Sequence, residues 1–283
     1  MDPDVAGSSP VDRPNFPWLS MTFLQALLLG VIQGITEFLP VSSSTHLTLA
    51  KTLMGLPPGE ALILFDLLCH FGTLTITLYV FWQDIVSLFT FRKDKLWQIA
   101  LAMLPLVPAY FLLRPLRQSI HGFGALGITL AMTSFLLFLG ERFRIKQIAS
   151  ITKSRRARDA ICIGALQAAS LIPGISRSAS TISCARCLGW NTSEAVRFSF
   201  LLAIPTIFGG NCLETLHLLK TSSLAHHLPI SPICCLIGFG ASAVGAFVVI
   251  KPAIRFLEKG RLGPVAWYCL VLGCSLIIFS LWT

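Results

Sequence analysis

Long apolar stretches dominate the pattern of hydrophobic and polar positions along this chain. A stretch of about 20 apolar residues is long enough, as an α-helix, to cross the roughly 30 Å of hydrocarbon in a bilayer. Six stretches meet this length, and we expect each to be a membrane-spanning helix. They cover residues 61–82, 97–113, 122–140, 195–218, 230–250 and 263–282. The second is short and contains two prolines, which predict a kink rather than the end of the span.

Two further apolar segments are interrupted by a proline and a cluster of hydroxyl side chains. In residues 21–55 the interruption runs from Leu39 through Pro40 to Ser44, and in residues 159–190 from Ile172 through Pro173 to Ser176. We interpret both as helix-break-helix hairpins that enter the membrane and return on the same side. The predicted fold is therefore an all-α integral membrane protein with six transmembrane helices and two re-entrant hairpins.

Composition supports a membrane protein and excludes a soluble one. Of the 283 residues, 54% are hydrophobic and only 12% are charged, and the mean hydropathy is +0.74. A soluble domain of this size could not cover such a chain with polar surface. The net charge is +9, but the basic residues fall in loops rather than on a stripe with interleaved aromatic residues, so we expect no nucleic-acid partner.

The distribution of Lys and Arg predicts the orientation in the membrane, because cytoplasmic loops are rich in cations. Segments 83–96, 141–158 and 251–262 carry fourteen of the 22 cations. The loops expected on the other side carry five, and the remaining three lie in or beside the second hairpin. Both termini are therefore predicted to lie outside the cytoplasm. Residues 1–20, rich in Pro and Asp, are expected to form a flexible tail and not a signal peptide.

A weak internal repeat is also present. A shift of 133 residues aligns Pro40 with Pro173, and a shift of 134 aligns Gln33 with Gln167. The two halves, residues 21–150 and 151–283, then each contain one hairpin and three spans. An odd number of crossings inverts the second half, and broken helices of inverted repeats commonly meet near the midplane to line a polar site.

The first hairpin carries an unusual set of polar residues. Gln33 and Glu37 lie on one helix face, and a carboxylate inside an apolar segment is costly and usually functional. Ser42, Ser43 and Ser44 stand at the start of the next helix, where hydroxyls can also serve simply as caps. His46 follows Ser43 by three residues, which suits a nucleophile with a general acid or base. Alternatively, Glu37 only reaches water or pairs with Arg177 of the second hairpin.

The second hairpin has the features of an anion site. Arg177 opens a helix, an unfavourable place for a cation unless an anion binds there. Hydroxyls surround it on Ser176, Ser178 and Thr181, and exposed amides at a helix start bind phosphate well. In the alternative interpretation, Arg177 is a residue of the membrane interface whose side chain extends toward water. If the two helix starts converge, the volume between them suits a phosphate or diphosphate.

These two segments resemble a known family. The run from Gln33 to His46, QGITEFLPVSSSTH, and the run from Pro173 to Thr181, PGISRSAST, are similar to the two signature motifs of the undecaprenyl-diphosphatase family of the bacitracin-resistance type. The segment FSFLLAIP, residues 198–205, also matches the family pattern, and the resemblance covers about residues 21 to 283.

The resemblance implies a multi-pass enzyme of the bacterial plasma membrane that hydrolyses undecaprenyl diphosphate to undecaprenyl phosphate. Such an enzyme recycles the lipid carrier of peptidoglycan synthesis, confers bacitracin resistance, has its site open to the outer, periplasmic side, and uses a divalent cation, Mg²⁺ or Ca²⁺. By position, Glu37 resembles an acidic residue of the family, Ser43 and His46 its catalytic hydroxyl and imidazole, and Arg177 its phosphate-binding arginine. Gln33 stands where many members have Glu.

The expected mechanism follows from these assignments. The predicted phosphate-binding residues are Ser42, Ser176, Arg177, Ser178 and Thr181. Glu37 and Gln33 are expected to hold the cation, and His46 to activate either Ser43, giving a phosphoserine, or water. Asp66 and His70 could assist the site, but we expect each to serve in a loop or in packing. A transporter or flippase of polyprenyl phosphates is the alternative function, for which the pair of Ser43 and His46 would not be needed. The sequence is also compatible with a homo-oligomer.

Overall fold

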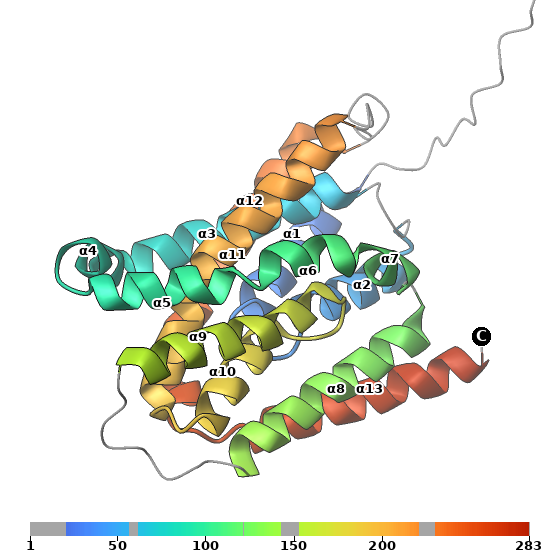
Figure 1. Cartoon of the computed structure of the whole chain (residues 1–283). Helices are drawn as coiled ribbons and strands as arrows, with labels where there is room; N and C mark the ends of the chain where they lie inside the picture. Colours follow the sequence, from blue (N-terminus) through green and yellow to red (C-terminus); the bar gives the residue numbers. More distant parts are fainter. Residues whose placement is uncertain (1–20, 57–61, 121, 143–152, 221–229, 283) are drawn as a thin grey trace, which may run out of the picture.

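The computed structural model describes residues 21–56, 62–120, 122–142, 153–220 and 230–282, and these contain helices but no strands (Figure 1). The predicted tail, residues 1–20, lies outside the described residues. Six helical segments in the described chain are long and apolar enough to cross a membrane, which confirms the six predicted spans. They are α3 (Ile63–Val80), α5 with α6 (Lys93–Leu112), α8 (Phe123–Arg142), α11 (Thr192–Lys220), α12 (Pro232–Glu258) and α13 (Gly263–Trp282).

Helix boundaries differ from the predicted ones where charged residues continue a helix. The predicted loop 83–96 contains α4 (Trp82–Thr90), and α12 continues past Pro252 to Glu258. Hydropathy marks where a helix leaves the hydrocarbon, and the helix itself can extend further into water. The second span is divided into α5 (Lys93–Met103) and α6 (Leu106–Leu112), followed by α7 (Arg114–Ser119). This division at Pro105 confirms the predicted kink.

Both predicted breaks are present. The first hairpin consists of α1 (Phe23–Thr36) and α2 (Ser43–Leu53), which pack against each other. The second consists of α9 (Lys153–Ala168) with the short 3₁₀ turn η2 (Ala169–Leu171), followed by α10 (Arg177–Cys187) packed on α9. Re-entry of these hairpins on one side of the membrane stays a prediction.

The packing of the helices is reciprocal between the two halves. Helix α1 packs on α12, and its counterpart α9 packs on α5 and α6; α3 packs on α12, and its counterpart α11 on α5. Helix α8 packs on its own counterpart α13, and the two lie side by side in Figure 1. Gln33 and its counterpart Gln167 are both completely buried, and the side-chain oxygen of each has no hydrogen-bond partner. These reciprocal contacts support the internal repeat.

Helix α1 lies unusually close to α12 because glycines face it. A Cβ added at Gly30 would lie 2.5 Å from the carbonyl oxygen of Gly238, and one at Gly34 would lie 2.5 Å from that of Ser242. Small residues allow such close contact between membrane helices. Because α1 ends one residue before Glu37, this contact fixes the position of the first break relative to the bundle.

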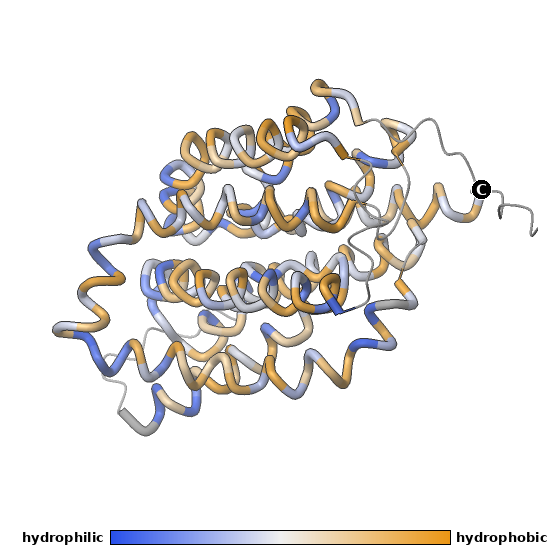
Figure 2. Tube along the Cα trace, turned by 90° about the horizontal axis from the view of Figure 1, so that it is seen from above, coloured by the Kyte–Doolittle hydropathy of each residue, from blue (hydrophilic) through white to orange (hydrophobic). Residues whose placement is uncertain are grey.

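The outer surface of the bundle is apolar, as expected of a protein surrounded by lipid. Figure 2 shows that hydrophobic residues make up most of the length of the helices. Large apolar side chains are exposed, among them Phe135, Phe247 and Val271, each more than half exposed. Ion pairs gather at the two ends, with Arg156–Glu194 at one end and Arg117–Glu214 at the other. The chain is therefore a multi-pass membrane protein.

Candidate functional site

The two helix breaks lie against each other inside the bundle. The Arg177 guanidinium Nη2 donates to Oε1 of Glu37 at 2.8 Å, which joins the start of α10 to the end of α1. Two weaker contacts join the same segments, from Ser178 Oγ to the Leu39 carbonyl at 3.4 Å and from the Gly174 amide to Ser44 Oγ at 3.4 Å. The breaks therefore form a single polar site.

Glu37 is the centre of this site. Its side chain is almost completely buried, and Oε2 accepts hydrogen bonds from Ser43 Oγ at 2.9 Å and Gln33 Nε2 at 2.9 Å. The Nε2 atom of His70 lies 3.7 Å from the same oxygen. A buried carboxylate persists only when it is paired and hydrogen-bonded, and here both of its oxygens have partners.

The backbone at the first break is held in an uncommon conformation. Ser42 has φ +65°, and it is the one non-glycine residue with positive φ in the part of the chain that the structure describes. This conformation costs of order 1–3 kcal/mol and often occurs at functional sites. Although Ser42 is the residue before α2, its side chain makes no capping hydrogen bond, contacting instead Ser44 Oγ at 3.1 Å. The Ser42 hydroxyl therefore does not cap α2.

The second break is attached to α8. Thr133 Oγ1 donates to the Gly174 carbonyl at 2.9 Å and accepts from the Ser176 amide at 2.9 Å. Gly174 itself has φ +95°, in the region that favours glycine. Because α8 carries Thr133 and packs on α10, the position of Arg177 depends on this contact.

We predict that Gly174→Ala destabilises the protein by about 1–3 kcal/mol and lowers its activity. A Cβ at this position would lie only 1.8 Å from Thr129 Oγ1, and the positive φ adds strain. The control is Gly209→Ala, because a Cβ there meets nothing within 4 Å and Ala favours a helix. Thermal unfolding in detergent would measure both, and an unfolding midpoint of Gly174→Ala at or above that of Gly209→Ala would contradict the prediction.

The hydroxyls of the second motif are committed to internal hydrogen bonds. Ser176 caps α10 by accepting from the Ala179 amide at 3.3 Å, and Thr181 Oγ1 lies 2.6 Å from Ser199 Oγ. Ser176, Ser178 and Thr181 are all buried. Direct phosphate binding by these three side chains stays a prediction, while their hydrogen bonds hold α10 in place.

The His46 ring has hydrogen-bond partners other than Ser43 in this structure, and activation of Ser43 or of water by His46 stays a prediction. The ring of His46 lies between other partners, with Nδ1 2.8 Å from the Ser42 carbonyl and Nε2 2.7 Å from the hydroxyl of Tyr268 on α13. Residues three apart lie on the same side of a helix, but the His46 side chain extends past Ser43 and contacts Tyr268 on α13. The Ser43 hydroxyl instead donates to Glu37.

Two residues of the site were not expected from the sequence. His70 was assigned to packing, yet it faces Glu37. The signal was available, because an ionisable residue inside an apolar span is the criterion that singled out Glu37. Tyr268 carried no comparable signal, since aromatic residues are common in membrane helices. Asp66 forms an ion pair with Lys51 on α2, apart from the Glu37 carboxylate.

Three buried aromatic rings lie between Glu37 and the start of α4. Phe38, the residue after Glu37, stacks on Phe200 with ring centroids 5.9 Å apart, and Phe81 stacks on Phe200 at 5.7 Å. All three are at most 4% exposed. The stack therefore extends from the residue next to Glu37 to Phe81, the residue before α4.

The side-chain oxygens of Glu37 and Gln33 are of the type that a hard cation prefers. Gln33 Oε1 is buried without a hydrogen-bond partner, next to the carboxylate to which its amide nitrogen donates. No group of three His, Cys, Asp or Glu side chains that could hold a metal is found among the described residues. Mg²⁺ is commonly held by one or two carboxylates together with substrate phosphate oxygens and water, and Glu37 is one such carboxylate.

Comparison with known proteins assigns the chain to a family. The model of the family described as bacitracin resistance protein BacA matches residues 26–275. The chain belongs to the BacA family. An undecaprenyl-diphosphatase of Protochlamydia amoebophila is 38% identical over 259 residues, covering 92% of this chain and 99% of the relative. An undecaprenyl-diphosphatase of Halothermothrix orenii is 33% identical over 267 residues with the same coverage, and one of Bacteroides thetaiotaomicron is 33% identical over 271 residues. Both motifs of the site lie inside the stretch matched by the BacA model.

Proposed function

We propose that this protein hydrolyses undecaprenyl diphosphate to undecaprenyl phosphate and inorganic phosphate. The observation that carries the proposal is the contact between Glu37, Ser43 and Arg177, which brings a carboxylate, a hydroxyl and a guanidinium together at two helix starts within a membrane bundle. The BacA family and the names of the relatives supply the substrate. The product is the lipid carrier of peptidoglycan synthesis, and its recycling is the basis of bacitracin resistance.

The diphosphate group would bind between the two breaks. Arg177 has a planar fork of donors that suits phosphate oxygens, and the starts of α2 and α10 add positive dipole ends. The prenyl chain would remain in lipid, because the outer surface of the bundle is apolar. Arg177 would exchange one contact with Glu37 for the incoming phosphate and so keep a negative partner throughout.

The geometry favours attack by Ser43. Its hydroxyl donates to Glu37 Oε2, so the carboxylate is placed to take the proton as the oxygen attacks the terminal phosphorus. The phosphoanhydride bond breaks, undecaprenyl phosphate leaves with the bonding electrons, and a phosphoserine forms. Water then attacks the phosphoserine, giving inorganic phosphate and returning the proton to Ser43. His46, held by Tyr268, and His70, beside Glu37, would bind and orient the phosphate or this water.

We propose a divalent cation, Mg²⁺ or Ca²⁺, held by Glu37 and the unpartnered oxygen of Gln33. Such an ion would neutralise charge on the phosphate oxygens. Gln33→Ala is predicted to raise the Mg²⁺ concentration for half-maximal phosphate release by about tenfold, with kcat retained at saturating Mg²⁺. The control is Gln167→Ala, the buried counterpart in the second half. If both variants require the same Mg²⁺ concentration as the wild type, Gln33 does not hold the ion.

We propose that the site opens to the outer side of the bacterial plasma membrane. The predicted cytoplasmic segments gather at one end, where Arg156 contacts Glu194 and Arg197 contacts Glu258. The aromatic stack lies between this end and Glu37. Lys51 lies near the C-terminal end of α2, and Ser43 is eight residues before it. At 1.5 Å per residue, Ser43 therefore lies about 12 Å from Lys51 along the helix.

The reciprocal packing of the two halves is also typical of transporters. Phosphate release in detergent distinguishes hydrolysis from transport. In detergent micelles there are no compartments, so a transporter has no measurable turnover. The purified protein is expected to release one phosphate from each undecaprenyl diphosphate. No release in detergent, together with movement of polyprenyl phosphate across vesicle membranes, would favour the transporter.

A further inference from the structure

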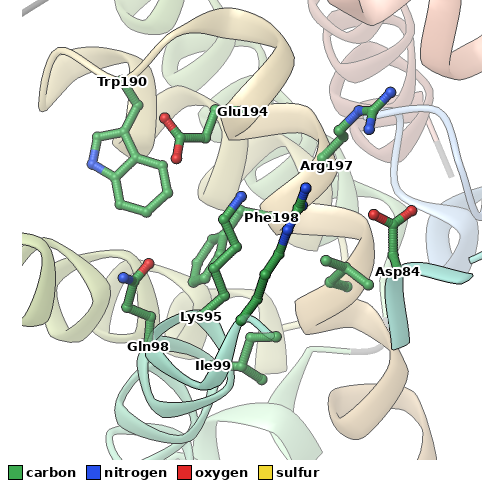
Figure 3. A pocket seen from close by; sticks show the side chains of 10 residues that line it. Asp84, Lys95, Gln98, Ile99, Trp190, Glu194, Arg197 and Phe198 are labelled. Atoms are coloured by element: carbon green, nitrogen blue, oxygen red, sulfur yellow. The ribbon is translucent and has the colours of Figure 1, made fainter. Parts of the chain in front are cut away.

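A second cluster of cations lies at the end of the bundle beyond the aromatic stack. A small, partly open cleft lies between α4, α5 and the start of α11. The residues that line it include Asp84, Arg92, Lys95, Gln98, Glu194 and Arg197. Figure 3 shows the Lys95 side chain rising into the middle of the cleft, with Trp190 and Gln98 on one side and Asp84 on the other. None of these residues contacts Glu37 or Arg177 through a hydrogen bond or ion pair in the described chain.

Part of the charge in this cleft is already neutralised. The Glu194 carboxylate accepts from Arg156 Nη1 at 2.6 Å, an ion pair in which both side chains are about three-quarters buried. The guanidinium of Arg197 lies 3.6 Å from the Glu258 carboxylate and is largely exposed. These pairs hold the start of α11 in place and add no net charge to the cleft.

The remaining charge is an excess of one cation. Arg92 and Lys95 make no ion pair within the described residues, and Asp84 is the one other carboxylate among the lining residues. Two cations facing one carboxylate leave a single positive charge, which a monoanion would balance. The buried side-chain amide of Gln98 can add a hydrogen bond.

Exposed aromatic side chains near the cleft indicate the depth of lipid headgroups. Aromatic side chains are exposed on the neighbouring helices, with Trp82 at 63%, Phe89 at 64% and Trp97 at 66% exposure. Tryptophan is enriched at the membrane–water interface, where its ring lies at headgroup level. These helices belong to the end that the cation distribution places in the cytoplasm. Basic pockets between helices on that side bind anionic lipid headgroups.

We propose that this cleft is a binding site for the singly charged phosphodiester headgroup of an anionic phospholipid. Lys95 and Arg92 would donate to the phosphate oxygens, and the acyl chains would lie against the exposed aromatic residues of α4 and α5. The site is separate from the proposed hydrolysis of a diphosphate at Glu37, since a phosphodiester has no terminal phosphate to release. It would fix α5 against α11 from the side opposite the catalytic site.

The test compares retention of lipid by purified protein in nanodiscs or by native mass spectrometry. The wild type is expected to retain phosphatidylglycerol in preference to phosphatidylcholine. In the double variant Arg92→Gln/Lys95→Gln, the ratio of retained phosphatidylglycerol to phosphatidylcholine is expected to fall about tenfold. In Lys95→Gln alone, the ratio is expected to fall about threefold. The matched control is Lys93→Gln/Lys259→Gln, which removes two exposed cations that do not line the cleft and is expected to retain the wild-type preference.

Three outcomes would overturn the proposal. Equal retention of the two lipids by the wild type would show that no anionic headgroup site exists. An unchanged preference in both Arg92→Gln/Lys95→Gln and Lys95→Gln would place the headgroup elsewhere. Displacement of phosphatidylglycerol by an equal concentration of inorganic phosphate would assign the cleft to the free ion. Phosphate release by the variants in phosphatidylcholine nanodiscs is expected to match the wild type, which shows that they fold.

Discussion

Arg177→Ala is expected to lower the rate of phosphate release from undecaprenyl diphosphate by about 10³-fold or more. The guanidinium is the cation that joins the two helix breaks, and it donates to Glu37 at 2.8 Å. Loss of this cation removes the group proposed to stabilise charge on the transferred phosphate, and it leaves the Glu37 carboxylate buried with fewer partners. Arg177→Lys is expected to recover a small part of the rate, because an ammonium supplies charge without a bidentate fork.

Two controls separate catalysis from folding in this experiment. Removing one partner of a buried ion pair can cost about 3–5 kcal/mol of stability, so thermal unfolding of Arg177→Ala is measured alongside its activity. Arg117→Ala removes a more exposed cation that lies 3.8 Å from Glu214 and is expected to leave the rate nearly unchanged. A folded Arg177→Ala protein that works within tenfold of the wild-type rate would remove Arg177 from the mechanism.

Ser43→Ala has the second large expected effect, a loss of about 10³-fold or more in the rate of phosphate release. The Ser43 hydroxyl is the group that donates to Glu37 and is proposed to attack phosphorus. Substrate labelled in its terminal phosphate is expected to leave label on wild-type protein after an acid quench and none on Ser43→Ala. This result would identify the phosphoserine route and exclude direct attack by water.

Ser44→Ala is the matched control, because the two hydroxyls lie in the same turn of α2. Ser44 Oγ accepts a 3.4 Å contact from the Gly174 amide and does not contact Glu37. Its loss is expected to lower the rate by less than tenfold. If Ser44→Ala loses as much activity as Ser43→Ala, the effect belongs to the backbone of this turn and not to a nucleophile.

The sequence predicted the architecture well because membrane insertion depends on local properties. All six spans follow from runs of apolar residues, and each of the two breaks follows from a Pro near a cluster of hydroxyls. The helix α4 was missed because its polar residues suggested a loop, although an interfacial helix needs only one apolar face.

The site was predicted less completely, because side-chain partners depend on tertiary geometry. The convergence of Glu37 and Arg177 followed from the repeat, whereas the contacts of His46 with Tyr268 and of His70 with Glu37 join helices that are distant in sequence. The hydroxyls of Ser176 and Thr181 cannot be divided between structural and phosphate-binding roles by spacing alone. Their hydrogen bonds within the second break become visible only when α8 and α11 are in place.

The central claim is that the two breaks form one catalytic site, and the phosphate-release rate of the double variant Ser43→Ala/Arg177→Ala tests it most directly. Residues that act in one chemical step are strongly non-additive when removed together. The double variant is therefore predicted to be within a fewfold of the slower single variant. Losses that multiply would instead show that Ser43 and Arg177 act independently, and the account of a single site would be wrong.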